Sequence, residues 1–518
     1  MNSLLSALQN PELYPHPVTE FAVIETHISW VLLTGDYAYK IKKPVNFGFL
    51  DFSTLAQRKF FCQEELRLNQ RLAAEIYLEV VSITGTPEQP ALNGDGAVFE
   101  YAVKMRQFPQ SAQFDRLLQQ GQLSVDQIQS LAHTVAQFHQ CSATADTDTV
   151  FANPDVIKQA VDENFFHILP TITDSETRAQ LQAIAHWCET EHQRCYPEFT
   201  RRKQEAYVRE CHGDMHLRNI ALMGDAIIVF DCIEFNEAFR WIDVMSEIAF
   251  VIMDLDDRNQ SGFATTFLNQ YLEDTGDYNG LTVLPYYLVY RAMVRAKVAC
   301  LRLAQAELTS IERDQVLSDL RHYLDLAWRY TKPHAHFLCI THGLSGSGKS
   351  WLTDKLMNGE RFIRLRSDVE RKRLYHLTAE QDSNSRPGTG IYSQEATEMT
   401  YQRLKEITSR LLEKHWSVIV DATFLQCSQR ESFHQLASSL KAPFLILDFQ
   451  ATPALLRDRI RARQSRQNVS EATLEVLERQ ISHYQALSLD EQHYCLSLHT
   501  ATAPAQVWRQ IHKHLTTV

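Results

Sequence analysis

The chain has 518 residues, of which 44% are hydrophobic and 22% are charged, and its formal net charge is −12. This length exceeds what one hydrophobic core usually supports, so we expect two domains, and the composition excludes collagen-like and low-complexity chains. The charge is divided unevenly, −16 over residues 1–333 and +4 over residues 334–518, so the acidic N-terminal part is poorly suited to bind a nucleic acid.

The first residues, MNSLLSALQNPELYPHP, lack the basic leader and long apolar run of a signal peptide. No segment holds the roughly 20 uncharged apolar residues that a membrane helix needs. The ten cysteines are scattered without the spacing of metal ligands, and Cys188 and Cys195 form the closest pair of this kind. We therefore expect a cytoplasmic protein with reduced thiols and no membrane partner.

The first hundred residues predict strands around one long helix. Residues 30–43 (WVLLTGDYAYKIKK) form two alternating runs around the turn TGD, which indicates a hairpin. Residues 53–72 have helical periodicity, with Ser53 as the expected N-cap. Two further strands are predicted at residues 79–84 and 97–105, separated by a turn rich in Gly, Pro and Asn.

From residue 114 to residue 330 the pattern is mostly helical, with a short loop-and-strand region at residues 211–235. A small β-rich lobe leading into a larger helical lobe is the order expected of a bilobal protein-kinase-like fold. Pro333 ends the last helix of this part, so we assign residues 1–332 to the first domain.

Residues 211–220, CHGDMHLRNI, contain the pattern H-G-D-x-H-x-x-N. Asp214 is the candidate catalytic base, because a carboxylate there can orient and deprotonate an acceptor hydroxyl. Asn219 and, after a further short strand, Asp231 are the candidate magnesium ligands. His212 and His216 are expected to hold the loop by hydrogen bonds rather than to catalyse.

This loop resembles that of the aminoglycoside phosphotransferase and choline kinase superfamily, and FDCIEFN at residues 230–236 matches its metal-binding turn. The resemblance implies ATP and Mg²⁺ as cofactors, and a small-lobe lysine that holds phosphates and pairs with a helix glutamate. Lys40, in an A-x-K element, is the candidate lysine, and Lys42 is the alternative. Glu65 is the candidate partner, with Glu64 as the alternative. No glycine-rich loop of the protein-kinase type precedes the lysine.

Strands and helices alternate in the second domain, residues 333–518. The strands are predicted at residues 336–341, 362–366, 417–421 and 443–449, and a helical segment follows each of them. This alternation predicts a parallel sheet with helices on both faces, which is an α/β architecture of the P-loop NTPase type.

Residues 343–350, GLSGSGKS, match G-x-x-x-x-G-K-[ST] between an apolar strand and a helix. Glycines allow backbone N–H groups to surround phosphate oxygens at the start of a helix. Lys349 is expected at the β- and γ-phosphates, and the Ser350 hydroxyl is expected on Mg²⁺. The predicted nucleotide-binding residues are Gly343, Ser345, Gly346, Ser347, Gly348, Lys349 and Ser350.

Two carboxylates follow later strands of this domain. Asp368 ends the second strand at the edge of the sheet that holds the phosphate loop, where it can act as a base or cap a helix. Asp421, at the end of VIVD, is the candidate carboxylate for Mg²⁺. A run of arginines on a late helix is interpreted as a lid that brings positive charge to the phosphates: Arg457, Arg459, Arg461 and Arg463.

The second domain resembles the small P-loop kinases, which include polynucleotide 5′-hydroxyl kinases, zeta-type toxins and gluconate kinases. The shared elements are GLSGSGKS, RSDVERKR (366–373), VIVDATF (418–424) and LRDRIRARQ (456–464). The resemblance implies that Asp368 is the base, Arg371 a substrate or phosphate contact and Arg463 a catalytic lid arginine. The two domains together resemble bacterial proteins described as bifunctional aminoglycoside phosphotransferase/ATP-binding proteins.

We therefore expect a bifunctional, Mg²⁺-dependent ATP phosphotransferase that acts on hydroxyl groups of small molecules. Two alternatives are open: one domain catalyses while the other senses nucleotide, or the chain is a nucleotide-gated, toxin-like regulatory protein. A nucleic-acid acceptor for the second domain is also open, but ATP phosphates alone account for its arginines.

Overall fold

The computed structural model describes residues 2–48, 50–303, 308–333, 336–357, 361–379, 381–383, 385, 388–463, 473–499 and 503–515. The chain forms two compact units. The first comprises residues 1–171 and 188–254, and the second comprises residues 172–187 and 255–518. Helices that precede residue 332 thus pack in the second unit. The functional division at residue 332 stays a prediction.

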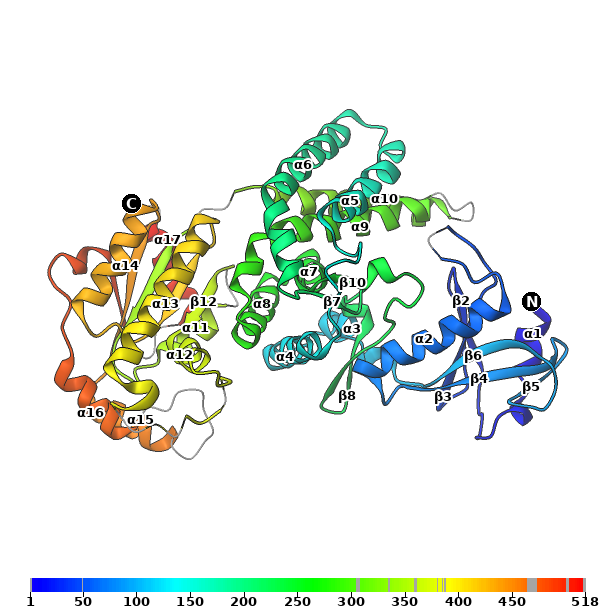
Figure 1. Cartoon of the computed structure of the whole chain (residues 1–518), viewed down its shortest axis with the longest axis horizontal. Helices are drawn as coiled ribbons and strands as arrows, with labels where there is room; N and C mark the ends of the chain where they lie inside the picture. Colours follow the sequence, from blue (N-terminus) through cyan, green and yellow to red (C-terminus); the bar gives the residue numbers. More distant parts are fainter. Residues whose placement is uncertain are drawn as a thin grey trace. The chain divides into compact units, whose positions relative to one another are not determined.

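The first unit begins with an antiparallel sheet (Figure 1). Helix α2 (Leu55–Ala73) covers one face, where Cys62 and Ala73 lie in an apolar cluster with Ala38 and Val103 of the sheet. Helix α1 (Asn2–Ala7) contributes to a second cluster through Leu4. The strands, in sheet order, are β1 (Ala22–Glu25), β2 (Ser29–Leu33), β3 (Tyr37–Lys42), β6 (Val98–Arg106), β4 (Tyr77–Thr86) and β5 (Gln89–Leu92).

The predicted hairpin, long helix and two later strands of this lobe are confirmed, but the N-cap of the helix differs, and α1, β1 and β5 were not predicted. The N-cap of α2 is Thr54 and not Ser53. The Thr54 hydroxyl accepts a hydrogen bond from the Gln57 N–H, and the Gln57 side-chain oxygen accepts one from the Thr54 N–H. Strand β5 was not predicted. It is a short edge strand of QPAL, and a proline is tolerated only at such an edge.

A mostly helical region follows, as the sequence predicted. Its paired strands at residues 208–243 carry the loop that contains Asp214. The elements are α3 (Phe114–Gln119), α4 (Val125–Cys141), α5 (Pro154–Ile168), α6 (Ser175–Gln204), β7 (Val208–Glu210), β8 (Ile220–Met223), β9 (Ala226–Val229), β10 (Trp241–Asp243), α7 (Val244–Asp257), α8 (Ser261–Thr275), α9 (Leu284–Leu303) and α10 (Ser310–Tyr330). None of the helices that the structure describes is long and apolar enough to cross a membrane.

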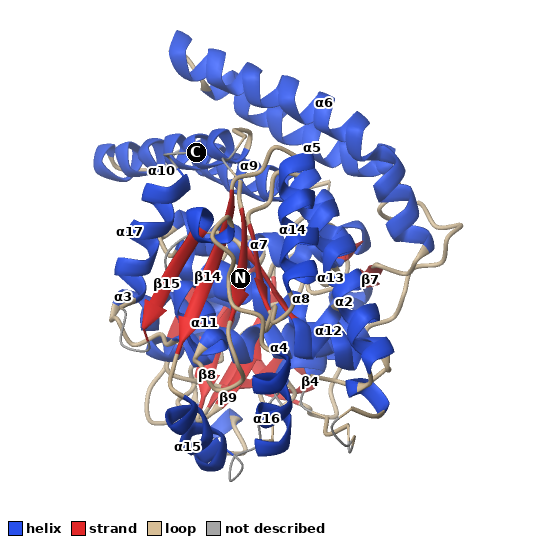
Figure 2. Cartoon of the chain, turned by 90° about the vertical axis from the view of Figure 1, so that its left-hand side faces the viewer, coloured by secondary structure: helices blue, strands red, loops and turns tan. Residues whose placement is uncertain are grey.

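The second unit contains a parallel sheet with helices on both faces, so the predicted P-loop architecture is confirmed (Figure 2). The strands, in sheet order, are β12 (Ile363–Arg366), β13 (Val418–Asp421), β11 (Leu338–His342), β14 (Phe444–Gln450) and β15 (Cys495–His499). Strand β15 was not predicted, because it is short and only partly apolar. The helices are α11 (Lys349–Leu356), α12 (Ser367–Leu374), α13 (Gln394–Glu413), α14 (Cys427–Ser439), α15 (Pro453–Arg463), α16 (Leu474–His483) and α17 (Pro504–Leu515).

Candidate active sites

The first candidate site is built on two lysines of β3 and one glutamate of α2. Lys40 and Lys42 are two residues apart in a strand, so both side chains project from the same face of the sheet. Each ammonium group lies 2.7 Å from a different oxygen of the Glu65 carboxylate. The structure thus brings Glu65 to both candidate lysines, whereas Glu64 pairs with Arg67 on the surface of the helix.

The second partner of each lysine distinguishes the two. Lys40 Nζ lies 2.6 Å from Oδ1 of Asp231, whose side chain is 49% exposed, whereas Lys42 pairs with the buried Glu234. Burial would lower the pKa of Lys40, but Asp231 and Glu65 outweigh it and hold that pKa well above its ordinary value. Burial would raise the pKa of Glu65, yet the two lysines lower it to about 2. Lys40 therefore faces the open side of the site, and Lys42 lies behind it.

Asp214 and Asn219 lie together in the loop that follows β7. The Asn219 side-chain N–H donates to the Asp214 carbonyl oxygen at 3.0 Å and to its carboxylate oxygen Oδ2 at 3.1 Å. His216 Nε2 is 3.4 Å from the same carboxylate oxygen. Asn219 is buried, whereas the Asp214 side chain is 36% exposed. Asn219 therefore contacts the proposed base from the protein interior, and the carboxylate of the base is accessible to solvent.

The backbone of this loop is held by buried side chains. His212 Nε2 lies 2.9 Å from the Phe230 carbonyl oxygen, and burial lowers the pKa of His212 to about 4, so its ring is neutral at pH 7. The Glu247 carboxylate of α7 accepts hydrogen bonds from the N–H groups of His212 and Gly213. Gly213 has φ +90°, and a Cβ there would lie 2.6 Å from the Phe239 carbonyl oxygen, so only glycine fits this turn.

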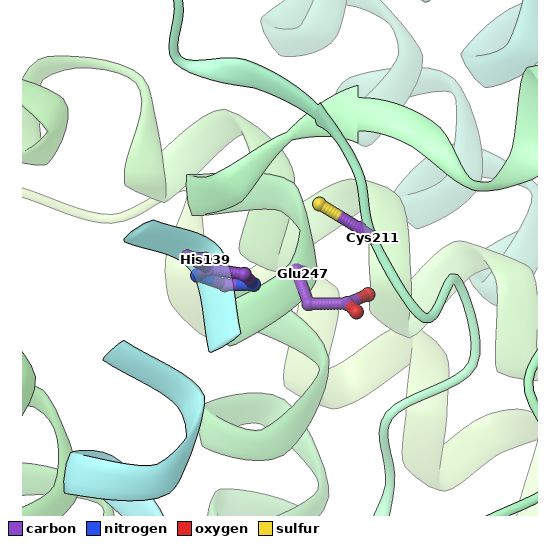
Figure 3. A group of neighbouring side chains, drawn as sticks. All are labelled: His139, Cys211 and Glu247. Carbon is purple, nitrogen blue, oxygen red and sulfur yellow. The ribbon is translucent and has the colours of Figure 1, made fainter. Parts of the chain in front are cut away.

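Glu247 also belongs to a buried cluster with His139 and Cys211 (Figure 3). One potential ligand atom from each of these side chains lies within 4.8 Å of the others, as in a metal site. However, the Glu247 carboxylate already accepts hydrogen bonds from backbone N–H groups. Burial, together with the positive charges of Arg209 and Arg71, lowers the pKa of His139 to about 3. The positive charge of two guanidinium groups disfavours a cation, so we interpret this cluster as a support for the loop.

Asp231 is held in a conformation that few non-glycine residues adopt. Its φ is +64°, in the left-handed region, and its N–H donates to the Tyr77 hydroxyl at 3.1 Å. The next N–H, of Cys232, donates to the Asn69 side chain of α2 at 2.9 Å. Such strain persists only where surrounding contacts impose it, and it is common at functional sites.

Three residues that support this site, Glu247, Tyr77 and Asn69, gave no signal in the sequence. Glu234, in contrast, lies in the quoted motif FDCIEFN.

The different positions of the two lysines predict different losses on substitution. We expect Lys42→Met to lower the free energy of unfolding by about 3–5 kcal/mol, because it leaves Glu234 and one oxygen of Glu65 buried without a cation. Lys40→Met leaves Glu65 paired with Lys42 and should cost less stability. Denaturant unfolding of both variants, followed by circular dichroism, measures the difference. Equal losses would contradict this division of roles.

The second candidate site surrounds the loop of residues 343–350, and its geometry is that of a phosphate-binding loop. The loop lies between β11 and α11, and Lys349 is the first residue of the helix. Gly343 has φ +140°, and a Cβ there would lie 2.8 Å from the Phe449 carbonyl oxygen. Lys349 Nζ donates to the carbonyl oxygens of Gly343 and Leu344, at 2.9 Å each, so the lysine folds back over the loop.

A pocket of about 1020 Å³ opens over this loop, and most of the site residues predicted for the second domain line it. Asp368, in the first turn of α12, and Asp421, at the end of β13, both line it. Asp421 is buried and accepts a hydrogen bond from Thr353 of α11 at 3.3 Å. The predicted nucleotide-binding residues that line the pocket are Ser345, Gly346, Ser347, Gly348, Lys349 and Ser350.

Arg371 reaches the same pocket from α12. It is buried and donates to the Ile391 carbonyl oxygen at 2.9 Å and to the Thr397 hydroxyl at 3.2 Å. Of the arginine run, Arg459 lines the pocket and donates to the Gly346 carbonyl oxygen at 3.1 Å, whereas Arg457 pairs with Glu478 on the surface. The side chain of Arg463 lies outside the part of the chain that the structure describes.

Gln480 of α16 contacts the phosphate loop and was not predicted. Its side-chain oxygen accepts a hydrogen bond from the Ser345 N–H at 2.9 Å, the kind of contact a phosphate oxygen makes. Because ligand and side chain would compete for this N–H, we expect Gln480→Ala to raise the affinity for ATP about 2- to 10-fold. Calorimetric titration in a Lys40→Met background, which weakens the other site, would measure this change.

The matched control for this prediction is Glu475→Ala, since Glu475 is exposed on the same helix. It should leave the affinity for ATP unchanged. A lower affinity in Gln480→Ala would contradict the prediction and would mean that Gln480 itself contacts the bound nucleotide.

The C-terminal site is also recognised at the family level. Residues 338–487 match the family model described as an AAA domain, so this part of the chain is a P-loop domain of that type. Over nearly its whole length the chain is similar to uncharacterized proteins of Mycobacterium tuberculosis and Mycobacterium bovis. Each is 27% identical over 464 residues, which cover 89% of this chain and 90% of the relative.

Solved structures similar to the chain include kinases. A putative kinase from Chloroflexus aurantiacus is 17% identical, with a TM-score of 0.30, over 35% of this chain and all of that one. The amicoumacin kinase hAmiN is 13% identical, with a TM-score of 0.38, over 61% of this chain and 89% of that one. A choline/ethanolamine kinase family protein from Mesorhizobium loti is 8% identical, with a TM-score of 0.37, over 63% of this chain and 98% of that one.

Proposed function

We propose that this protein is an ATP-dependent phosphotransferase with two separate sites, each transferring the γ-phosphate of ATP to a hydroxyl group of a small molecule. The observation that carries the proposal is that, in each unit, a lysine and at least two carboxylates from distant parts of the sequence converge at one place. Positioning and electrostatic stabilisation supply most of the rate in phosphoryl transfer, and these residue types supply both.

In the first unit Lys40, oriented by Glu65, binds phosphate oxygens of ATP. Asp214 accepts the proton of the acceptor hydroxyl as the hydroxyl oxygen bonds to the γ-phosphorus. The bond from that phosphorus to the bridging oxygen breaks, and ADP leaves with the electron pair. The contact of Asn219 with Asp214 keeps the carboxylate directed toward the open side, which supports this role.

In the second unit the backbone N–H groups of the phosphate loop and the Lys349 ammonium bind the β- and γ-phosphates. Asp368 is the base for the second acceptor. Arg371 and Arg459 bring positive charge to the same pocket, where charge develops on the transferred phosphoryl group. The two sites share no residue, so we expect the two reactions to be independent.

Both sites suit Mg²⁺, which prefers oxygen ligands. Asn219 and Asp231 would hold it in the first unit, and Ser350 and Asp421 in the second. The Asp231 carboxylate already attracts the Lys40 ammonium, which is consistent with a site for positive charge. When bound, the ion would neutralise charge between the β- and γ-phosphates.

The alternative readings are a single catalytic domain beside a nucleotide sensor, and a nucleotide-gated regulatory protein. The first leaves either Asp214 or Asp368 without a catalytic use, and the second leaves both without one. Label transfer distinguishes these readings: wild type, Asp214→Ala and Lys349→Ala are incubated with γ-labelled ATP and a bacterial metabolite extract.

Two sets of labelled products, one lost in each variant, are expected. Loss of every product in either variant would contradict independence of the sites. ATP binding by the wild type without any labelled product would contradict the proposed function and favour the regulatory reading.

A further inference from the structure

Helix α8, which contacts the edge of the parallel sheet, carries a buried glutamate, Glu273, that has no role in the nucleotide site as described so far. Strand β12 lies at one edge of the sheet, and it leads directly into α12, whose first turn contains Asp368. An edge strand exposes backbone groups that need partners. Helix α8, from a distant part of the sequence, lies beside this strand in the same compact unit (Figure 1).

Asn269 of α8 satisfies the backbone of the edge strand. Its side-chain N–H donates to the Phe362 carbonyl oxygen at 2.8 Å, and its side-chain oxygen accepts from the Arg364 N–H at 2.6 Å. One amide side chain thus makes the pair of bonds that a neighbouring strand would make. Asn269 is buried, so this contact fixes the register of α8 against β12.

Glu273, one turn further along α8, holds two arginines of β12. Its Oε1 accepts from Arg364 at 3.0 and 2.8 Å, and its Oε2 accepts from Arg366 at 3.1 Å. Glu273 is only 3% exposed, and the two arginines, which neutralise it, hold its pKa below the ordinary value although burial would raise it. The carbonyl oxygen of Glu273 also accepts a hydrogen bond from Arg373 of α12.

The two arginines connect this glutamate to the nucleotide pocket, which both of them line. Arg364 Nη1 lies 3.5 Å from Oδ1 of Asp354 in α11, the helix that follows the phosphate loop. Arg366 is paired in register with Asp421 on the neighbouring strand. Arg366 therefore lies beside Asp421, the candidate magnesium ligand, and two residues before Asp368, the proposed base.

We infer that Glu273 is a positioning residue of the C-terminal phosphotransfer site, acting through Arg364 and Arg366 on the segment that carries Asp368. The site thus includes part of α8, which precedes the P-loop domain in the sequence. This inference rests on the proposed function of that site. Glu273, which precedes residue 332, would thus contribute to the reaction at Lys349.

The test is Glu273→Gln in the full chain, which keeps the shape of the side chain but removes its charge. For the labelled product that depends on Lys349, we expect kcat to fall about 10- to 100-fold and KM for ATP to stay within about twofold. The product that depends on Asp214 is the internal control and should not change. Asp314→Asn, an exposed carboxylate on α10 of the same unit, is the matched control.

Hydrogen exchange of the same variants provides a readout that needs no acceptor. In Glu273→Gln, amides of residues 361–374 should exchange about tenfold faster or more, while the other strands of the sheet keep their protection. Unchanged exchange in that segment, or an unchanged kcat for the Lys349-dependent product, would overturn the inference. If the wild type forms no Lys349-dependent product, the proposed function fails instead, and exchange still decides whether Glu273 holds β12.

Discussion

Asp214→Asn is expected to lower the rate of the N-terminal transfer reaction about 10²–10⁴-fold, the usual contribution of a general base. Asparagine has nearly the same shape as aspartate but cannot accept the proton of the acceptor hydroxyl. Because the Asp214 side chain is partly exposed and its loop is held by Glu247 and His212, the variant should fold as the wild type does. The affinity for ATP should also be retained, since Lys40 is unchanged.

Initial rates of the Asp214-dependent labelled product, measured at saturating ATP, test this expectation. Asp225→Asn is the matched control, because Asp225 is exposed in the turn between β8 and β9 of the same unit. A loss smaller than about threefold would mean that Asp214 is not the base, since a general base contributes far more. An equal fall in the Lys349-dependent product would show instead that the two sites act together.

Lys349→Ala is expected to lower the C-terminal transfer rate about 10²–10³-fold, comparable to the loss of one donor that stabilises a transition-state anion. The lysine is 8% exposed, and its ammonium donates to the carbonyl oxygens of Gly343 and Leu344 and to the Ser347 hydroxyl. Its charge therefore lies at the loop where phosphates are proposed to bind. Removing it should weaken ATP binding as well, because the positive charge interacts with ground-state phosphates too.

The control for this variant is Lys355→Ala on the same helix, since Lys355 is partly exposed and lies 3.8 Å from Asp354 rather than at the loop. It should retain the wild-type rate. Two measurements are needed, the rate of the Lys349-dependent product and the affinity for ATP in the Lys40→Met background. Retention of both in Lys349→Ala would exclude the loop of residues 343–350 as the functional nucleotide site.

The parts of this protein that the sequence alone predicted are those in which the interacting groups are close in the chain. The phosphate loop is eight consecutive residues that connect a strand to a helix, and the predicted phosphate contacts all lie within these residues. Asp214 and Asn219 are five residues apart and meet within one loop. The alternation of strands and helices likewise predicted the parallel sheet, because that periodicity is a local property.

The tertiary structure decided the questions that depend on distant partners. Lys40 and Lys42 share one strand face and one glutamate, and their second partners, Asp231 and Glu234, lie about 190 residues away in the sequence. Glu273 is part of no motif, and it gains a role only because α8 packs against β12. Periodicity indicates which face of an element is buried but not which element covers it, since packing joins surfaces that the sequence does not bring together.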